Sequence, residues 1–474
     1  MSSKKRIIYI LAGPASFLLC RLLLVSSFGV NGAYAVGTAV WTVQWWITRP
    51  VHISVTAMLP VVVNVFFNII PTETLTSQFS SETAIRLLGA NLICIPWVKT
   101  GLDRRLSLKA LCLIGPSVRQ QMIVWMFAGA LMSLFVPNIV SCAMLTPIAI
   151  SMLDFLGEKD ISSSKIAAPI LLAIAWGSGI GGAGTPIGTM NLVAISFLEE
   201  YTGNEYLYVD WVLRMFPFLL LMLAVISIYI LTIKLPVKQL PNTKEFFVKS
   251  YKELGKISRG EVICLTAFIL AMAISFMRPL YANLLPALKP TYVFLVVGFL
   301  MFFLTDENHQ RLLVWKEAEK NVMWNMLFLL SGGLGVGKLL TETGATDSLA
   351  ELMAHIDIGG GFVMVLIFTV FACMMAEFSS NTAAAAISIP IVISITEKFS
   401  LNLVPYWYIT SMAFNSAYLL PLAVRAVPVS YGLDVKQLLK KGAPLCIICM
   451  LSISIIGYLF MRFWPFFSEI TVHG

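Results

Sequence analysis

Two short polar breaks, 243 residues apart, interrupt long apolar stretches of the sequence. The first is Pro137-Asn138-Ile139 and the second is Ser380-Asn381-Thr382 (381 − 138 = 243). Pro147 and Pro390 follow the breaks at the same offset (390 − 147 = 243). A polar side chain at bilayer depth is costly unless it faces protein or a water-filled cavity. Matching breaks in two halves of an apolar chain therefore predict a transporter binding site where two repeats meet.

Composition places the chain in a membrane. Of its 474 residues, 58% are hydrophobic and 12% are charged, whereas a soluble protein carries about 25% charged residues. We expect an all-α polytopic membrane protein with roughly eleven crossings. The net charge of +8 comes from short flanks and loops, so it does not predict a nucleic-acid partner.

Basic clusters predict the orientation. Lys4, Lys5 and Arg6 precede the first apolar stretch, so the N-terminus should be cytoplasmic, in a plasma (inner) membrane. The hydrophilic segment 236–260 separates the two halves and is rich in lysine. We expect this segment to be a solvated cytoplasmic linker that contains an amphipathic helix.

The segments upstream of the two breaks predict an inverted repeat. Segment 83–109 matches 326–351 at the same offset, but the first ends in basic residues and the second in acidic residues. Equivalent loops of opposite charge should lie on opposite sides of the membrane. Gly89-Ala90-Asn91 and Ser331-Gly332-Gly333 lie midway and predict the tips of re-entrant hairpins. The alternative is two ordinary helices that pack through glycine.

The second break has the chemistry of an ion site. A helix that begins in mid-membrane presents free N–H groups and a partial positive charge. Ser380, Asn381 and Thr382 are good N-caps, and they are also candidate ligands for an anion or a small cation. The alternative is a polar kink satisfied by neighbouring helices.

The segment SSNTAAAAISIPI resembles the second SNT motif of the divalent-anion/sodium symporter family. Four other segments are similar to that family in the same order: HISVTAMLPVVV, VKTGLDRRLSL, GIGGAGTPIGTMNLVAI and WNMLFLLSGGLGVGKLL. The resemblance covers residues 50–466. It implies a homodimer in which each protomer has a scaffold and an elevator-type transport domain with re-entrant hairpins and broken helices. It also implies a small anionic substrate between the two breaks.

The resemblance assigns site residues one by one. The implied substrate-binding residues are Asn138, Thr189, Ser380, Asn381, Thr382 and Arg425, and the implied sodium ligands are Ser133, Asn138, Gly188, Asn381 and Ala423. The first motif departs from the family, because Pro137 and Ile139 replace a serine and a threonine. Two hydroxyls are thereby lost, one from the sodium side and one from the substrate side.

Arg425 is the largest departure. Val424-Arg425-Ala426-Val427 stands where the family has a Thr-Pro-Pro-Asn segment. An arginine at membrane depth usually faces a cavity or a partner. Arg425 either replaces a sodium ion as a fixed cation, binds a substrate carboxylate, pairs with a buried acid such as Glu377, or extends to the membrane interface.

These patterns predict a secondary active transporter of small dicarboxylates or similar divalent anions, with Na⁺ as the candidate coupling ion. The alternatives are a sodium-independent anion exchanger and a non-transporting sensor or scaffold. We expect no cofactor and no enzymatic activity, since the chain has no HExxH, Walker or nucleophile-elbow motif. The expected divisions in chain order are scaffold 1–80, first repeat 81–208, scaffold and linker 209–320, second repeat 321–442, and C-terminal helix 443–474.

Overall fold

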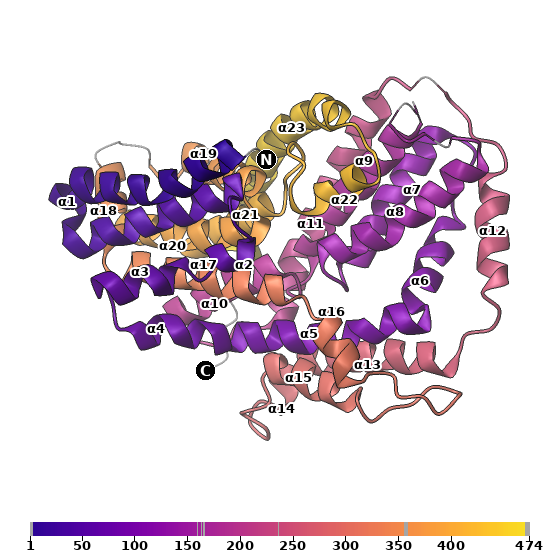
Figure 1. The fold of residues 1–474 in the computed structure, drawn as a ribbon, viewed down its shortest axis with the longest axis horizontal. Coiled ribbons are helices and arrows are strands. Elements are labelled where there is room, and N and C mark those ends of the chain that lie inside the picture. The colour runs from indigo at the N-terminus through magenta and orange to yellow at the C-terminus, as the bar shows by residue number, and fades with distance from the viewer. Residues whose placement is uncertain are drawn as a thin grey trace.

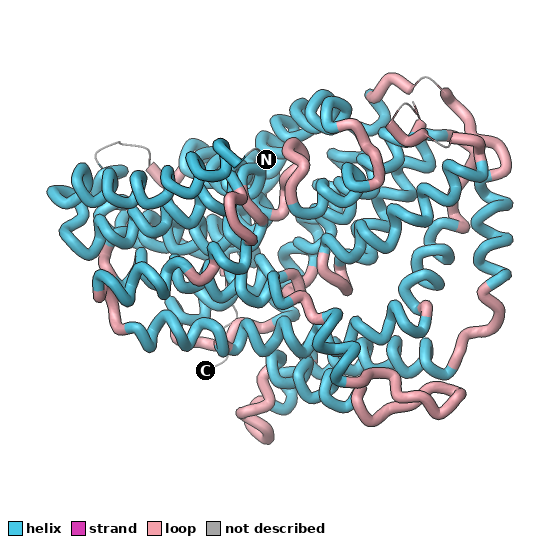
Figure 2. The backbone as a smooth tube through the Cα atoms, in the orientation of Figure 1, coloured by secondary structure: helices cyan, strands magenta, loops and turns pink. Residues whose placement is uncertain are grey.

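The computed structural model describes residues 3–158, 160–162, 164, 166–235, 237–354 and 359–469, and within them the chain is built of helices and loops (Figure 2). The helices before the central linker are α1 (Ser3–Thr48), α2 (Ile53–Thr56), α3 (Leu59–Phe67), α4 (Thr72–Thr76), α5 (Glu82–Thr100), α6 (Leu102–Leu111), α7 (Val118–Ser133), α8 (Asn138–Phe155), α9 (Ala167–Gly181), α10 (Thr189–Thr202) and α11 (Tyr208–Thr232). Those after it are α12 (Thr243–Glu253), α13 (Arg259–Phe276), α14 (Arg278–Tyr281), α15 (Pro290–Leu300), α16 (Trp315–Asn321), α17 (Trp324–Glu342), α18 (Ala345–Ala354), α19 (Phe362–Phe378), α20 (Asn381–Lys398), α21 (Leu403–Phe414), α22 (Ala426–Ser430) and α23 (Val435–Phe463). Four short 3₁₀ turns complete the set: η1 (Ser77–Ser80), η2 (Gly182–Gly184), η3 (Ala423–Arg425) and η4 (Pro465–Ser468).

The predicted all-helical membrane fold is confirmed. In the described part of the chain, six helices are long and apolar enough to cross a membrane, or seven if the pair α16–α17, bent by 57°, forms one span. The sequence predicted roughly eleven crossings, apart from two segments judged too polar or too rich in glycine to cross fully. Several apolar stretches, such as α15 and α19, form helices that are too short to qualify alone.

The internal repeat is visible in the helix boundaries. α18 begins 243 residues after α6 (345 − 102), and α20 begins 243 residues after α8 (381 − 138). α6 and α18 have 10 residues each, and α8 and α20 have 18 each. The two breaks in the sequence thus start equivalent helices in two equivalent sets of elements.

The two halves share one core. α7 packs along α9, α19 packs along α21, and α10 contacts both α20 and α21. Figure 1 shows α1 at one end of the molecule and α12 at the other, with the elements that carry the breaks between them. The predicted amphipathic helix of the linker is α12, which buries Phe247 and exposes its lysines.

The hairpin tips do not lie where the sequence placed them. α5 continues through Gly89-Ala90-Asn91 and turns at Gly101, while α17 continues through Ser331-Gly332-Gly333 and turns at Gly344. Gly101 and Gly344 have φ values of +81° and +69° and are themselves 243 residues apart. Glycine adopts this left-handed conformation at little cost, which explains its use at both turns.

Gly89 and Gly332 serve close packing instead. A Cβ on Gly89 would lie 2.6 Å from the backbone nitrogen of Leu295 in α15, and a Cβ on Gly332 would collide with the backbone of Ala57. Small residues let helix backbones approach closely inside a membrane. The alternative interpretation of these glycines as packing faces is therefore correct, and the placement of the tips at residues 89–91 and 331–333 is wrong.

We expect Gly89→Ala to lower stability by about 1–3 kcal/mol, because the added methyl group must push two backbones apart. Thermal unfolding of the purified chain in detergent measures the change. Gly335→Ala is the matched control, since Gly335 also lies inside a helix and a Cβ there meets nothing closer than 3.6 Å. Equal melting temperatures for the two variants would contradict the packing role of Gly89.

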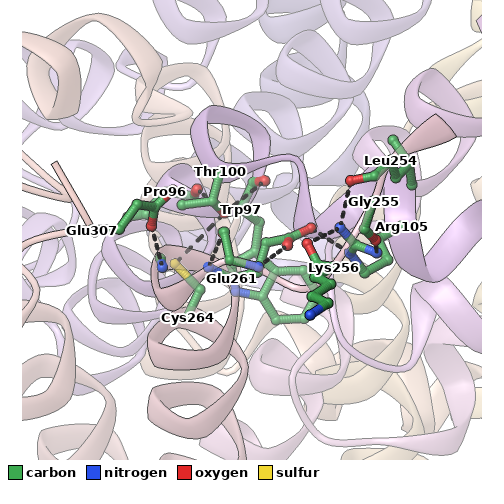
Figure 3. A network of polar contacts seen from close by, with 12 residues as sticks. Pro96, Trp97, Thr100, Arg105, Leu254, Gly255, Lys256, Glu261, Cys264 and Glu307 are labelled. Carbon is green, nitrogen blue, oxygen red and sulfur yellow. Dashed lines mark hydrogen bonds and ion pairs between the residues drawn. The ribbon is translucent and has the colours of Figure 1, made fainter.

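The first hairpin consists of α5 and α6, which meet at Gly101. A polar network joins this hairpin to the linker between the two halves (Figure 3). Arg105 of α6 donates to Glu261 Oε1 at 2.6 Å and to the backbone oxygens of Gly255 (2.9 Å), Lys256 (3.1 Å) and Leu254 (3.2 Å). Glu261 Oε2 in turn accepts the Ser258 N–H at 2.7 Å and closes a capping box at the start of α13. The end of α12 and the start of α13 are thus held on the second arm of the hairpin.

Candidate functional site

Both breaks are real interruptions between helices. α7 ends at Ser133 and α8 begins at Asn138, with Pro137 as its N-cap residue. Proline suits this position because its missing N–H would have no partner in a first turn. α19 ends at Phe378 and α20 begins at Asn381, where the Ser380 hydroxyl caps the helix by accepting the Ala383 N–H at 3.1 Å.

The two breaks meet at one cavity, which we call the central cavity. Its volume is about 520 Å³ including the space at its mouth. The lining residues are Pro137, Asn138, Ile139, Gly188, Thr189, Met190, Met323, Met326, Ser380, Asn381, Thr382, Ala423 and Val424. The structure therefore brings together all the sequence-predicted site residues except Ser133 and Arg425.

Three helices begin at this cavity: α8 at Asn138, α20 at Asn381 and α10 at Thr189. None of the described lining residues carries a charge. The first N–H groups of a helix lack partners within the helix, and the N-terminal end carries about half a positive charge. Three such ends around an uncharged cavity make an environment that favours an anion.

Asn381 has an unsatisfied oxygen. The residue is 8% exposed, and its Oδ1 is buried with no hydrogen-bond partner among the described residues. A buried acceptor without a donor costs about 1–3 kcal/mol. A bound cation or a donor group on a ligand would remove that cost.

The side chains of the first half are anchored on the glycine-rich end of α9. Ser133 Oγ donates to the Ser178 carbonyl at 2.8 Å, and Asn138 Nδ2 donates to the Gly179 carbonyl at 2.7 Å. The oxygens Ser133 Oγ and Asn138 Oδ1 remain able to accept or coordinate. Ser133 lies one turn before the break and is buried outside the central cavity.

Two asparagines that were not assigned a role from the sequence support the loop before α10. Asn191 Nδ2 donates to the backbone oxygens of Gly182 (2.7 Å) and Thr185 (2.8 Å), and Asn415 Nδ2 donates to Asn191 Oδ1 at 2.9 Å. These bonds fix Gly188 and Thr189 against the second half. Asn191 lies in the segment GIGGAGTPIGTMNLVAI that resembles the family, whereas the only sequence signal of Asn415 was an asparagine inside an apolar stretch.

Arg425 does not line the central cavity. It is 2% exposed, its Nη2 lies 3.4 Å from Glu377 Oε2, and it donates to the backbone oxygens of Leu420 (2.6 Å) and Ala417 (2.8 Å). Of the alternatives left open by the sequence, the structure therefore shows the internal pair. Arg425 Nη2 makes no hydrogen bond among the described residues, and the structure places Arg425 outside the lining of the central cavity to which the sequence assigned it.

Glu377 organises the loop that carries Arg425. Its carboxylate accepts the backbone N–H groups of Tyr418, Leu419 (2.8 Å) and Leu420 (3.1 Å). Ala423, which follows in the same loop, is held at φ = +49° and lines the central cavity. A non-glycine residue with positive φ persists only where its surroundings impose it.

An apolar, all-helical chain whose broken helices meet around a central cavity belongs to the class of polytopic membrane transport proteins. The protein-family model CitMHS, described as a citrate transporter, matches residues 43–414 of this sequence. The chain belongs to this family.

Curated relatives and a solved structure agree with the assignment. The sodium-dependent dicarboxylate transporter SdcS of Staphylococcus saprophyticus is 25% identical over 472 residues, covering 96% of this chain and 91% of the relative. The same transporter of Staphylococcus aureus is 25% identical over 479 residues, covering 97% and 92%. The YdaH transporter of Alcanivorax borkumensis has a similar fold, with a TM-score of 0.54 and 13% identity over 83% of this chain and 88% of that one. The resemblance to divalent-anion/sodium symporters is thereby confirmed.

Proposed function

We propose that this protein is a secondary transporter of small dicarboxylates and that the substrate binds in the central cavity. The observation that carries the proposal is the convergence of three helix N-termini, drawn from both repeats, on one uncharged cavity. A carboxylate there would accept hydrogen bonds from first-turn N–H groups, from the Thr189 and Thr382 hydroxyls and from the asparagine amides. The curated relatives are named as sodium-dependent dicarboxylate transporters.

Sodium is the proposed coupling ion. Na⁺ is a hard cation that suits neutral oxygen ligands. Ser133 Oγ, Asn138 Oδ1 and the Gly188 carbonyl would serve in the first half, and Asn381 Oδ1 and the Ala423 carbonyl in the second. The relatives named above are sodium-dependent.

Uptake into proteoliposomes tests this function. We expect accumulation of radiolabelled succinate that needs an inward Na⁺ gradient and no internal anion. Uptake that requires internal dicarboxylate and ignores Na⁺ would replace symport with exchange. Succinate binding without uptake would favour a sensor, and the absence of both would overturn the proposal.

The division into moving parts belongs to the same proposal. The repeats 81–208 and 321–442 would form a transport domain that moves as an elevator, and segments 1–80, 209–320 and 443–474 would supply a homodimeric scaffold and its connections. The matched helix boundaries of the two repeats support this division. Light scattering in detergent should give a protein mass near twice 52.3 kDa, and a mass near that of one chain would contradict the dimer.

We also propose that the N-terminus and the linker with α12 face the cytoplasm across a plasma (inner) membrane. The lysines and arginines of both segments support this orientation. A cysteine introduced at position 2 should resist a membrane-impermeant thiol reagent in intact cells and react once the cells are opened.

A further inference from the structure

Arg49 sits in a fixed, strained turn between α1 and α2. Its φ is +50°, and its N–H donates to the Trp45 carbonyl at 2.9 Å. Arg6 Nε donates to the carbonyl of the next residue, Pro50, at 3.0 Å. A left-handed residue at this place commonly ends a helix, and here it fixes the point at which the Arg49 side chain leaves the backbone.

The Arg49 side chain lines a second cavity that adjoins the central one, with a volume of about 630 Å³ including its mouth. The two cavities share Ile139, Met326, Ser380 and Ala423 as walls. Ser379 and Arg49 are among the seven residues that line the second cavity and not the central one. A molecule that extends from the central cavity past Ser380 therefore enters the space that Arg49 faces.

Arg49 is the one charged residue among the described residues that line either cavity. Among all the residues that the structure describes, no carboxylate lies within ion-pair distance of the Arg49 guanidinium. Arg49 is itself exposed, so its guanidinium is open to solvent and to an anion that enters the cavity from it. Here the fitting counter-charge is an anionic ligand, and the planar guanidinium matches a carboxylate with two parallel hydrogen bonds.

We propose that Arg49 binds the second carboxylate of a dicarboxylate whose first carboxylate lies at the helix N-termini of the central cavity. The inference rests on the proposed function and adds the residue that selects for two carboxylates over one. Arg425 lines neither cavity and is paired with Glu377, so Arg49 and not Arg425 takes this part.

Binding of succinate and of butanoate to the full-length protein in detergent tests the inference. Butanoate has the same carbon chain with one carboxylate. We expect Arg49→Gln to weaken succinate binding roughly 10- to 100-fold and to leave butanoate binding nearly unchanged, so that the preference for succinate collapses. Arg49→Lys keeps the charge but lacks the planar fork. Its succinate affinity should therefore lie between those of the wild-type protein and of Arg49→Gln.

Arg104→Gln is the matched control, since Arg104 is an exposed arginine that lines a different cavity, between α6, α8 and α12. Unchanged succinate affinity in a folded Arg49→Gln protein would overturn the inference, as would an equal loss for both ligands. If the wild-type protein binds no dicarboxylate, the proposed function fails first and the inference fails with it. If the wild-type protein binds succinate and Arg49→Gln binds it equally well, only the inference about Arg49 fails.

Discussion

Asn381→Ala should abolish anion uptake while leaving the protein folded. Asn381 begins α20, and its side chain lies at the wall of the central cavity with an unpartnered Oδ1. Removing the amide would take one hydrogen-bond donor from the anion and one oxygen from the cation. At about 1.5 kcal/mol for each charge-assisted interaction, the loss is roughly 100-fold in affinity.

Stability should not fall in this variant, because the cap of α20 comes from Ser380, alanine favours helix and the unpartnered oxygen is removed. Uptake and thermal unfolding are measured together on the same preparation. Asn308→Ala, in an exposed loop, is the control and should keep full uptake. Retained uptake in Asn381→Ala would remove this residue from the substrate site.

Breaking the buried Arg425–Glu377 pair should cost far more stability than breaking an ion pair on the surface of the protein. Both residues are almost fully buried, at 2% and 0% exposure. Glu377→Gln leaves the Arg425 charge in the core without a counter-charge and weakens the hold on the backbone of residues 418–420. Loss of one partner of a buried pair costs about 3–5 kcal/mol.

Arg425→Gln should lower stability less than Glu377→Gln, since three backbone N–H groups still stabilise the Glu377 carboxylate. The double variant should lose less than the sum of the single losses, because it leaves no unpaired charge. Lys99→Gln is the control, since it breaks an exposed pair with Glu317 that is worth about 0–1 kcal/mol. If Glu377→Gln melts no lower than Lys99→Gln, the pair does not hold the loop.

The sequence was sufficient for the repeat and for the two breaks. A polar residue within an apolar run is rare, and a second occurrence at a fixed offset defines equivalent positions in two halves. The equal lengths of α8 and α20 follow from this equivalence. The expectation that Asn138 and Asn381 lie near each other agrees with their places on one cavity wall.

The hairpin tips were misplaced because glycine has two uses that look alike in a sequence. Gly101 and Gly344 supply positive φ at a turn, whereas Gly89 lets α5 approach α15, some 200 residues further along the chain. Only the tertiary contact distinguishes the two uses.

The charged residues near the site were the hardest to interpret for a similar reason. The partner of Arg425 depends on the path of a loop, so the sequence left several alternatives open. Arg49 resembled any basic residue flanking an apolar segment, and nothing in its neighbourhood in the sequence indicates that it borders a cavity with Ser379 and Ser380.

Arg105 and the linker residues that it contacts should differ in how freely their side chains vary among related proteins. Three of its bonds end on main-chain oxygens of residues 254–256, which are present whatever side chains stand there. Lys256 is therefore free to vary among related sequences, whereas Leu254 packs on the hydrophobic core and Gly255 has a φ of +66°. Arg105 is confined to a side chain with several donors. A comparison of homologues should show an invariant arginine opposite a variable position 256.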